Sequence, residues 1–137
     1  MKQVSKLVIV DHEDNYLMMW RSEHPTFPND PDLPGGTVEE GESSLEAMLR
    51  EVYEEAGISV DEALVKSVYD GTKYSAHGTH YALYVAKLKN RPDVTISWEH
   101  SSYEWLSRDN FLEKAKRAKD TFMQMAYDVL KGGKFDH

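Results

Sequence analysis

The chain has 137 residues, of which 40% are hydrophobic; this predicts a single globular domain over residues 1–137 and excludes a disordered or fibrous chain. It contains no cysteine, which excludes disulfides, thiolate metal sites and a cysteine nucleophile and fits a reducing, cytoplasmic location. The net charge is -8, concentrated between Gly36 and Ile58, so a surface-bound nucleic acid is disfavoured, whereas a metal-bridged phosphate can be attracted.

The first expected elements are two short strands. Lys6 to Asp11 and Tyr16 to Arg21 are rich in apolar residues and are joined by a polar turn, a pattern typical of a hairpin. The apolar run from Leu7 to Val10 is too short for a signal-peptide core or a membrane span, so we expect no membrane association. The next segment, Ser22 to Gly36, contains four prolines and two glycines, which predicts a long loop rather than a helix or a central strand.

A helix is predicted from Ser43 to Ala56. Ser43 followed by Glu46 is the pattern of a capping box, and Gly57 is a typical C-terminal stop. The apolar residues recur at the spacing of one buried helical face, and they are Leu45, Met48, Leu49, Val52 and Ala56. We therefore expect this helix to pack one side against a sheet.

The rest of the chain predicts further strands and a terminal helix. Val60 to Tyr69 and Thr79 to Lys89 have strand composition, and a shorter strand is expected around Tyr103 to Leu106. From Arg108 onward the chain is helical in composition, and Gly132 ends this helical part. Strands on both sides of one helix, followed by a terminal helix, predict a mixed sheet covered on two faces.

Three glutamates gather near the end of the first helix. At 100° per residue, Glu51, Glu54 and Glu55 fall on one face beside the apolar stripe. Acidic residues in the last turns oppose the helix dipole and repel each other. The cluster is either a solvated acidic face or a site for a divalent cation such as Mg²⁺, which prefers carboxylate oxygens, waters and substrate phosphates. The glycine-rich stretch LPGGTVEEGE just before the helix favours the cation site.

A fixed spacing of glycine, acidic and basic residues spans Gly36 to Ile58. Its members are Gly36, Glu42, Arg50, Glu51, Val52, Glu54, Glu55, Gly57 and Ile58. This spacing resembles the signature box of the Nudix hydrolases, in its MutT-like form, with every defining position filled. The resemblance implies an α/β (α+β) fold, an α/β/α sandwich with a mixed sheet between helices. It also implies hydrolysis of a diphosphate linked to another moiety, usually a nucleoside, with Mg²⁺ or Mn²⁺.

The resemblance assigns roles to the residues of the box. Glu51 and Glu55 match the principal metal ligands, and Glu54 matches a position that binds a further metal or polarises the attacking water. The carbonyl of Gly35, just before the box, corresponds to a backbone metal ligand.

Other box residues are expected to support the site. Glu42 and Arg50 match a contacting pair that ties the loop to the helix and orients the carboxylates, so Arg50 is expected to assist catalysis without reacting. Gly36 and Gly57 match structural glycines at the two ends of the box.

Three residues outside the box have two interpretations each. Glu99 resembles a loop glutamate that reaches the metal site as ligand or base, but it could be an ordinary loop acid. Arg21 resembles an arginine that meets substrate phosphates, or it is a surface residue at a strand end. Asp120 matches a position that contacts the base in MutT-type enzymes, and it is also a natural helix N-cap.

Aromatic residues and histidines give weaker signals. The family often has a tryptophan where this chain has Pro31, which affects loop shape and base packing. The six histidines lack metal-ligand spacing, so we expect surface or structural roles for them. The aromatic residues that could stack a base or belong to the core are Trp20, Phe27, Tyr74, Trp98 and Trp105.

The function that we expect is magnesium-dependent hydrolysis of a nucleoside triphosphate, an oxidised one included, to monophosphate and pyrophosphate. The alternatives within the enzyme class are a dinucleoside polyphosphate, a nucleotide sugar, dihydroneopterin triphosphate or an RNA 5' end. The alternative of another class is a non-catalytic Nudix module that binds a nucleotide and regulates a partner. No DNA-binding segment is evident, and monomer and homodimer both stay open.

Overall fold

The computed structural model describes residues 2–21 and 30–132 of the chain. Its strands are β1 (Gln3–Val10), β2 (Tyr16–Arg21), β3 (Pro31–Asp32), β4 (Gly35–Thr37), β5 (Val65–Gly71), β6 (His80–Lys87) and β7 (His100–Leu106). Its α-helices are α1 (Ser44–Ala56), α2 (Arg108–Lys116) and α3 (Thr121–Lys131), and a short 3₁₀ turn, Glu62–Leu64, precedes β5. No helix within the two described ranges is both long and apolar enough to cross a membrane.

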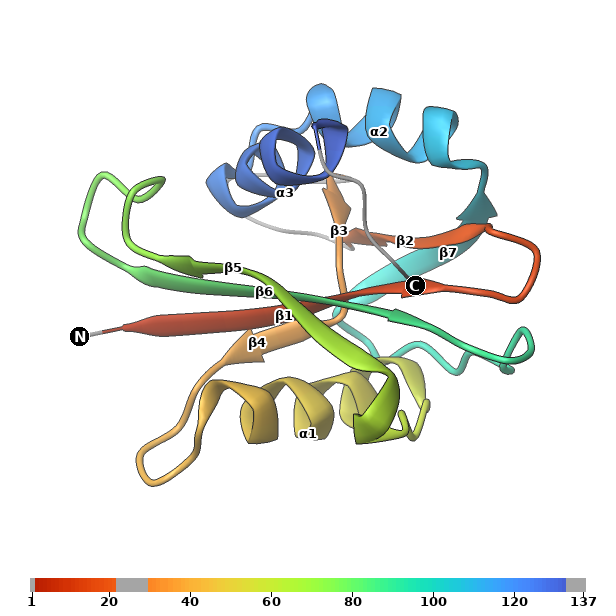
Figure 1. Ribbon diagram of the computed structural model, residues 1–137, viewed down its shortest axis with the longest axis horizontal. Helices are drawn as coiled ribbons and strands as arrows, with labels where there is room; N and C mark the ends of the chain where they lie inside the picture. The colour runs from red at the N-terminus through yellow and green to blue at the C-terminus, as the bar shows by residue number, and fades with distance from the viewer. Residues whose placement is uncertain (1, 22–29, 133–137) are drawn as a thin grey trace.

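The strands form one mixed sheet between two layers of helix (Figure 1). The main strand order is β3-β2-β1-β6-β5, with β4 paired to β1 and β7 paired to β2. β1 runs parallel to β6 along its whole length and antiparallel to β2 and β4. α1 covers one face of the sheet, and α2 and α3 cover the other. The predicted mixed sheet between helices is therefore confirmed.

The central strand β1 contributes to two separate hydrophobic cores. Leu7 and Ile9 belong to the core under α1, whereas Val8 and Val10 belong to the core under α2 and α3. This division follows from the alternation of side chains along a strand. All four side chains are fully buried. An apolar run that reads as one hydrophobic segment in the sequence thus stabilises both sides of the sheet.

The helix α1 begins and ends as the sequence predicts. The Ser43 hydroxyl accepts a hydrogen bond from the Glu46 N–H at 3.1 Å, and the Glu46 carboxylate accepts one from the Ser43 N–H at 2.9 Å. Gly57 follows the helix at a φ of 69°, a left-handed conformation that favours glycine. The apolar stripe faces the sheet, and its fully buried members are Met48, Val52 and Ala56.

The segment predicted as one long loop, Ser22 to Gly36, contains strand structure, so this prediction is wrong in its second half. Residues 22–29 lie outside the described part of the chain. Pro31–Asp32 pairs with β2, and Gly35–Thr37 pairs with β1. β3 is the end strand of the main order, where a proline without an N–H is tolerated.

Two further boundaries differ from the sequence-based expectation. The strand expected from Val60 begins only at Val65, because Asp61 caps the intervening 3₁₀ turn. The helical segment after Arg108 is divided into α2 and α3, and the Asp120 carboxylate caps the second helix by accepting a hydrogen bond from the Phe122 N–H. The break lets both helices cover the same face of the sheet (Figure 1).

Candidate metal and catalytic site

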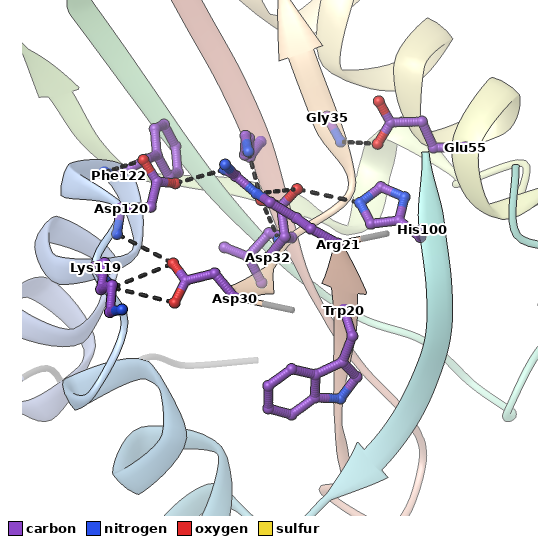
Figure 2. Close-up of polar contacts among 12 residues, drawn as sticks. Trp20, Arg21, Asp30, Asp32, Gly35, Glu55, His100, Lys119, Asp120 and Phe122 are labelled. Carbon is purple, nitrogen blue, oxygen red and sulfur yellow. Dashed lines mark hydrogen bonds and ion pairs between the residues drawn. The ribbon is translucent and has the colours of Figure 1, made fainter. Parts of the chain in front are cut away.

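The last turns of α1 lie against the β4 strand through two glycines. The Gly35 N–H donates a hydrogen bond to the Glu55 carboxylate, with 3.3 Å between N and Oε1 (Figure 2). Gly35 has a φ of 142°, and a Cβ there would lie 2.3 Å from the Ser5 carbonyl oxygen. A Cβ on Gly36 would lie 2.9 Å from the Glu51 carboxyl carbon. Gly35 therefore needs to be glycine for the strands to approach this closely, whereas a side chain at position 36 would displace the Glu51 carboxylate.

The three glutamates of α1 occupy different environments. Glu55 is buried, with 4% of its surface exposed, so the solvated-face interpretation does not describe it. The Glu51 side chain is 17% exposed, whereas that of Glu54 is 54% exposed. Arg50 lies between the last two, with its Nη1 atom 2.8 Å from Glu51 Oε1 and 3.3 Å from Glu54 Oε2. The helix thus places one acidic group inside the protein, one at its edge and one in solvent.

Arg50 also connects α1 to the preceding loop. Its Nε atom donates to Glu42 Oε2 at 2.8 Å, and its Nη2 atom donates to Glu42 Oε1 at 3.0 Å, which makes the contact bidentate. Glu42 Oε1 also accepts a hydrogen bond from the Glu39 N–H at 2.9 Å. The hydrogen bonds from Arg50, and then the one from Glu39, hold the pKa of Glu42 below its usual value. The loop and the helix therefore meet at the place that the resemblance predicts.

Glu55 forms a hydrogen bond with the Glu51 side chain, and its pKa is strongly raised. Burial raises the pKa of Glu55 to about 9, although the charge of Lys6 opposes this shift. The hydrogen bond with the Glu51 side chain raises the pKa of Glu55 further, while the bond from Gly35 lowers it. A pKa of about 9 favours the protonated form of Glu55 near neutral pH. A cation that replaced the proton would satisfy both groups, so this pair fits a divalent metal.

The donor set is that of a cation bound by few protein ligands. Within residues 2–21 and 30–132, no three acidic or histidine side chains converge as a ready-made metal cluster. Mg²⁺ commonly takes one or two carboxylates and completes its shell with water and substrate phosphates. Glu51, Glu55 and the Gly35 carbonyl are the residues that could supply such a site. Glu54 stays on the exposed side, where it could serve a second cation or a water.

The two predicted substrate-binding residues, Arg21 and Asp120, contact each other. Arg21 Nη2 lies 2.8 Å from Asp120 Oδ2, and Arg21 Nε lies 3.4 Å from Asp32 Oδ2 (Figure 2). Their side chains are only 14% and 16% exposed, so Arg21 is not the surface residue of the alternative interpretation. Asp120 is the N-cap of α3. A substrate contact by either residue would have to form beside this ion pair.

A buried ionic network next to these residues has no counterpart among the sequence-based predictions. Lys6 Nζ lies 2.5 Å from Asp32 Oδ1, and His100 Nε2 lies 3.1 Å from Asp32 Oδ2. Burial alone would lower the pKa of Lys6, but the charges of Asp32 and Asp120 raise it above its usual value. Lys6 is on the same face of β1 as the buried Val8 and Val10. A lysine in register with core valines is the sequence signal that could have revealed the network.

Glu99 lies in the turn between residues 97 and 100, just before β7. Its side chain is exposed, and its N–H donates to the Ser97 hydroxyl at 3.4 Å. The neighbouring Ser97 N–H donates to the Glu55 carbonyl at 3.1 Å, which brings the turn to the end of α1. The turn that carries Glu99 is therefore attached to the end of α1, and the role of Glu99 as ligand or base stays a prediction.

The aromatic residues divide between core and surface. The Trp20 indole N–H donates to Glu104 at 2.9 Å, and Trp105 is partly buried beneath the Arg91 guanidinium. Tyr74 packs against the core under α3, and its hydroxyl binds Asp128. Phe27 lies outside the described residues. Trp98 alone among the remaining candidates is almost wholly exposed.

Sequence comparisons relate the chain to one domain family and to several known enzymes. The family model described as the NUDIX domain matches residues 1–125. Nucleoside triphosphatase NudI from Enterobacter sp. (strain 638) is 30% identical over 130 residues, covering 85% of this chain and 91% of that protein. The asymmetrical bis(5'-nucleosyl)-tetraphosphatase of Caenorhabditis elegans is 30% identical over 89 residues, covering 63% of this chain and 64% of that protein.

Solved structures share the fold. A MutT/nudix family protein from Enterococcus faecalis superposes with a TM-score of 0.72 at 19% identity, over 95% of this chain and 61% of that one. The fold, the spacing of the box residues and the match over residues 1–125 agree with one another. The chain therefore belongs to the NUDIX domain family, that of the Nudix hydrolases.

Proposed function

We propose that this protein is a magnesium-dependent pyrophosphohydrolase that converts a nucleoside triphosphate, an oxidised one included, to the monophosphate and pyrophosphate. The observation that carries the proposal is the buried Glu55 paired with Glu51 and held against Gly35. The relationship to NudI, which extends over 91% of that relative, supports a nucleoside triphosphate as substrate.

The roles of the protein groups follow from their positions. Glu51, Glu55 and the Gly35 carbonyl would hold Mg²⁺ or Mn²⁺, and when bound, such an ion supplies positive charge to diphosphate oxygens and lowers the pKa of a water. Arg50 orients Glu51 and Glu54 while Glu42 fixes the guanidinium. Glu54 or Glu99 would accept the proton of the attacking water. Positioning and charge stabilisation account for most of the catalysis in substitutions at phosphorus.

A dinucleoside polyphosphate is the second candidate substrate. The similarity to the nematode tetraphosphatase supports it, although the aligned part covers 64% of that protein. The same carboxylate pair would serve either substrate, because both contain a phosphoanhydride linked to a nucleoside. The difference between them lies in what binds the group beyond the diphosphate.

A substrate screen with and without Mg²⁺ tests the proposed function. The panel contains ordinary and oxidised nucleoside triphosphates, dinucleoside polyphosphates, nucleotide sugars, dihydroneopterin triphosphate and a triphosphorylated RNA end, and released phosphate and pyrophosphate are measured. We expect pyrophosphate from a nucleoside triphosphate in the presence of Mg²⁺ only. Binding of nucleotides without turnover of any member of the panel would instead support a regulatory module.

The raised pKa of Glu55 predicts that Mg²⁺ binds more tightly as the pH rises. Metal binding needs the carboxylate, so a proton must leave Glu55, whose pKa is about 9 instead of 4.5. Below that pKa the affinity should increase with pH, approaching about tenfold per pH unit for one displaced proton, and level off above it. Calorimetry between about pH 6 and pH 8 measures the slope and the protons released. A dissociation constant that does not change over this range would contradict the prediction.

Glu99→Gln tests whether Glu99 accepts the proton. If it is the base, the variant should lose the acid limb of the pH profile of kcat and should keep its fold, because the side chain is exposed. Glu54→Gln provides the matched comparison, because the acid limb of the pH profile should be lost only in the variant that lacks the base. An unchanged pH profile and kcat in Glu99→Gln would reject this role.

A further inference from the structure

An aromatic side chain is displayed beside the candidate site. Trp98 is 86% exposed, compared with 61% for Tyr53 and 40% for Tyr103, the other large hydrophobic side chains exposed in the described part of the chain. A single exposed apolar residue is common on protein surfaces and needs no special explanation. The surroundings of Trp98, rather than its exposure alone, are what indicate a function.

Trp98 occupies the tip of a fixed turn. The His100 N–H donates to the Ser97 carbonyl at 3.2 Å, so Trp98 and Glu99 are the two central residues of a four-residue turn. Before the turn, the Ser97 N–H binds the Glu55 carbonyl at 3.1 Å, and the Thr95 N–H binds the Ala56 carbonyl at 2.9 Å. The chain that carries the indole is thus attached to the end of the helix that carries the candidate metal ligands.

The turn is fixed on its other side as well. His100, the first residue of β7, is buried, and its Nε2 atom lies 3.1 Å from Asp32 Oδ2. Asp32 precedes the strand that contains Gly35 by three residues. The turn is therefore attached to α1 through the Glu55 carbonyl and to β3 through Asp32, and Figure 2 shows the second of these contacts.

The charge around the turn selects the chemistry of its ligand. Glu99 is adjacent, and the helix end beneath the turn carries Glu51, Glu54 and Glu55. An additional anionic group would be repelled here unless a cation bound it. An uncharged aromatic ring has no such cost, and it gains stacking energy on an exposed indole face.

We infer that Trp98 is a stacking platform for the aromatic base of the substrate, and that it makes the enzyme prefer diphosphates with a base over diphosphates without one. This inference rests on the proposed function, because the diphosphate must lie at the end of α1 for its base to reach the turn. Trp98 acts on substrate selection and leaves the chemistry at phosphorus to the glutamates.

Kinetics of Trp98→Ala and Trp98→Phe test the inference. For the nucleotide substrate found in the screen, Trp98→Ala should raise KM about tenfold with little change in kcat, and Trp98→Phe should recover most of the loss. The inhibition constant of phosphoribosyl pyrophosphate, which has a diphosphate and a sugar but no base, should stay unchanged in both variants. Tyr103→Ala removes another exposed aromatic residue from the neighbouring strand and should leave KM for the nucleotide unchanged.

Fluorescence gives a readout that does not depend on turnover. Titration with a nucleoside triphosphate that carries a methylene bridge between the α and β phosphorus atoms should quench tryptophan emission in the wild type. The quench should be lost in Trp98→Phe, because Trp20 and Trp105 are partly buried. A quench that depends on Trp98 without hydrolysis in the screen would overturn the proposed function and support the stacking.

Three results would overturn the inference itself. The first is an unchanged KM and an unchanged quench in the Trp98 variants of an enzyme that hydrolyses nucleotides. The second is an equal loss of affinity for the nucleotide and for phosphoribosyl pyrophosphate. The third is a change from dimer to monomer in Trp98→Ala on sedimentation with KM unchanged, which would assign the indole to contact with a second copy of the chain.

Discussion

Replacing Glu55 or Glu51 with glutamine is expected to reduce kcat by at least about a hundredfold, by analogy with the loss of one preorganised charge-stabilising group. An amide keeps the shape of the side chain but removes the charge that a divalent cation requires. The fold should survive in Glu55→Gln, because burial raises the pKa of Glu55 to about 9 and so favours its neutral acid form near neutral pH. The amide is then a close replacement for the acid in contact with Gly35.

The measurement is kcat at saturating Mg²⁺, together with thermal unfolding of each variant. Glu40→Gln is the matched control, because Glu40 is an exposed acid of the same acidic segment and is not a box position. This control should keep nearly all of the activity. Wild-type turnover in either Glu51→Gln or Glu55→Gln at saturating Mg²⁺ would show that the metal assignment is wrong.

Asp32→Asn should lower the free energy of unfolding by about 3–5 kcal/mol, the usual cost of breaking a buried ion pair. One carboxylate oxygen of Asp32 accepts a hydrogen bond from the Lys6 ammonium, and the other oxygen contacts Arg21 and His100. The asparagine would leave the Lys6 ammonium buried without its counter-charge. This is the largest single stability loss that we expect from a polar substitution in the described residues.

Urea unfolding measures the effect, with Asp93→Asn as the control at an exposed aspartate. Lys6→Met together with Asp32→Asn should recover part of the loss, because the uncompensated charge is then removed. The double-mutant cycle separates the coupling of Lys6 and Asp32 from the effects of the single substitutions. A loss below about 1 kcal/mol in Asp32→Asn would contradict a structural role for the pair.

The features of the box were predictable because they are local in the sequence. The capping box, the buried stripe and the acidic face of α1 depend on residues three or four positions apart, so helical periodicity alone brings them together. The contact of Arg50 with Glu42 spans only eight positions. Family resemblance then supplied the roles that spacing cannot give.

The Lys6, Asp32 and His100 network was not predictable by the same means. Its contacts join residues 26 and 68 positions apart, on three strands whose neighbours in the sheet are set by the whole chain. The pairing of Arg21 with Asp120 spans 99 positions. Sequence patterns indicated what these side chains are, whereas the strand order decided which of them meet.

The short strands were missed for a related reason, and only Asp120, as a natural N-cap, indicated the break between the two terminal helices. Pro31 and Gly35 disfavour strands locally, yet both positions pair with a longer strand that is already in place. The break between α2 and α3 contains no proline or glycine, and it is stabilised by Asp30, whose carboxylate accepts the N–H groups of Lys119 and Asp120. Such contacts override composition because they satisfy otherwise free backbone groups.

The attachment of the residue 95–99 segment to α1 uses main-chain atoms on both sides. The hydrogen bonds from Thr95 and Ser97 to the Ala56 and Glu55 carbonyls involve no side chain. Substitutions at positions 98 and 99 should therefore leave these main-chain hydrogen bonds in place. A library randomised at position 98 alone offers a way to redirect the enzyme toward substrates with other bases, while the glutamates of its hydrolytic centre are unchanged.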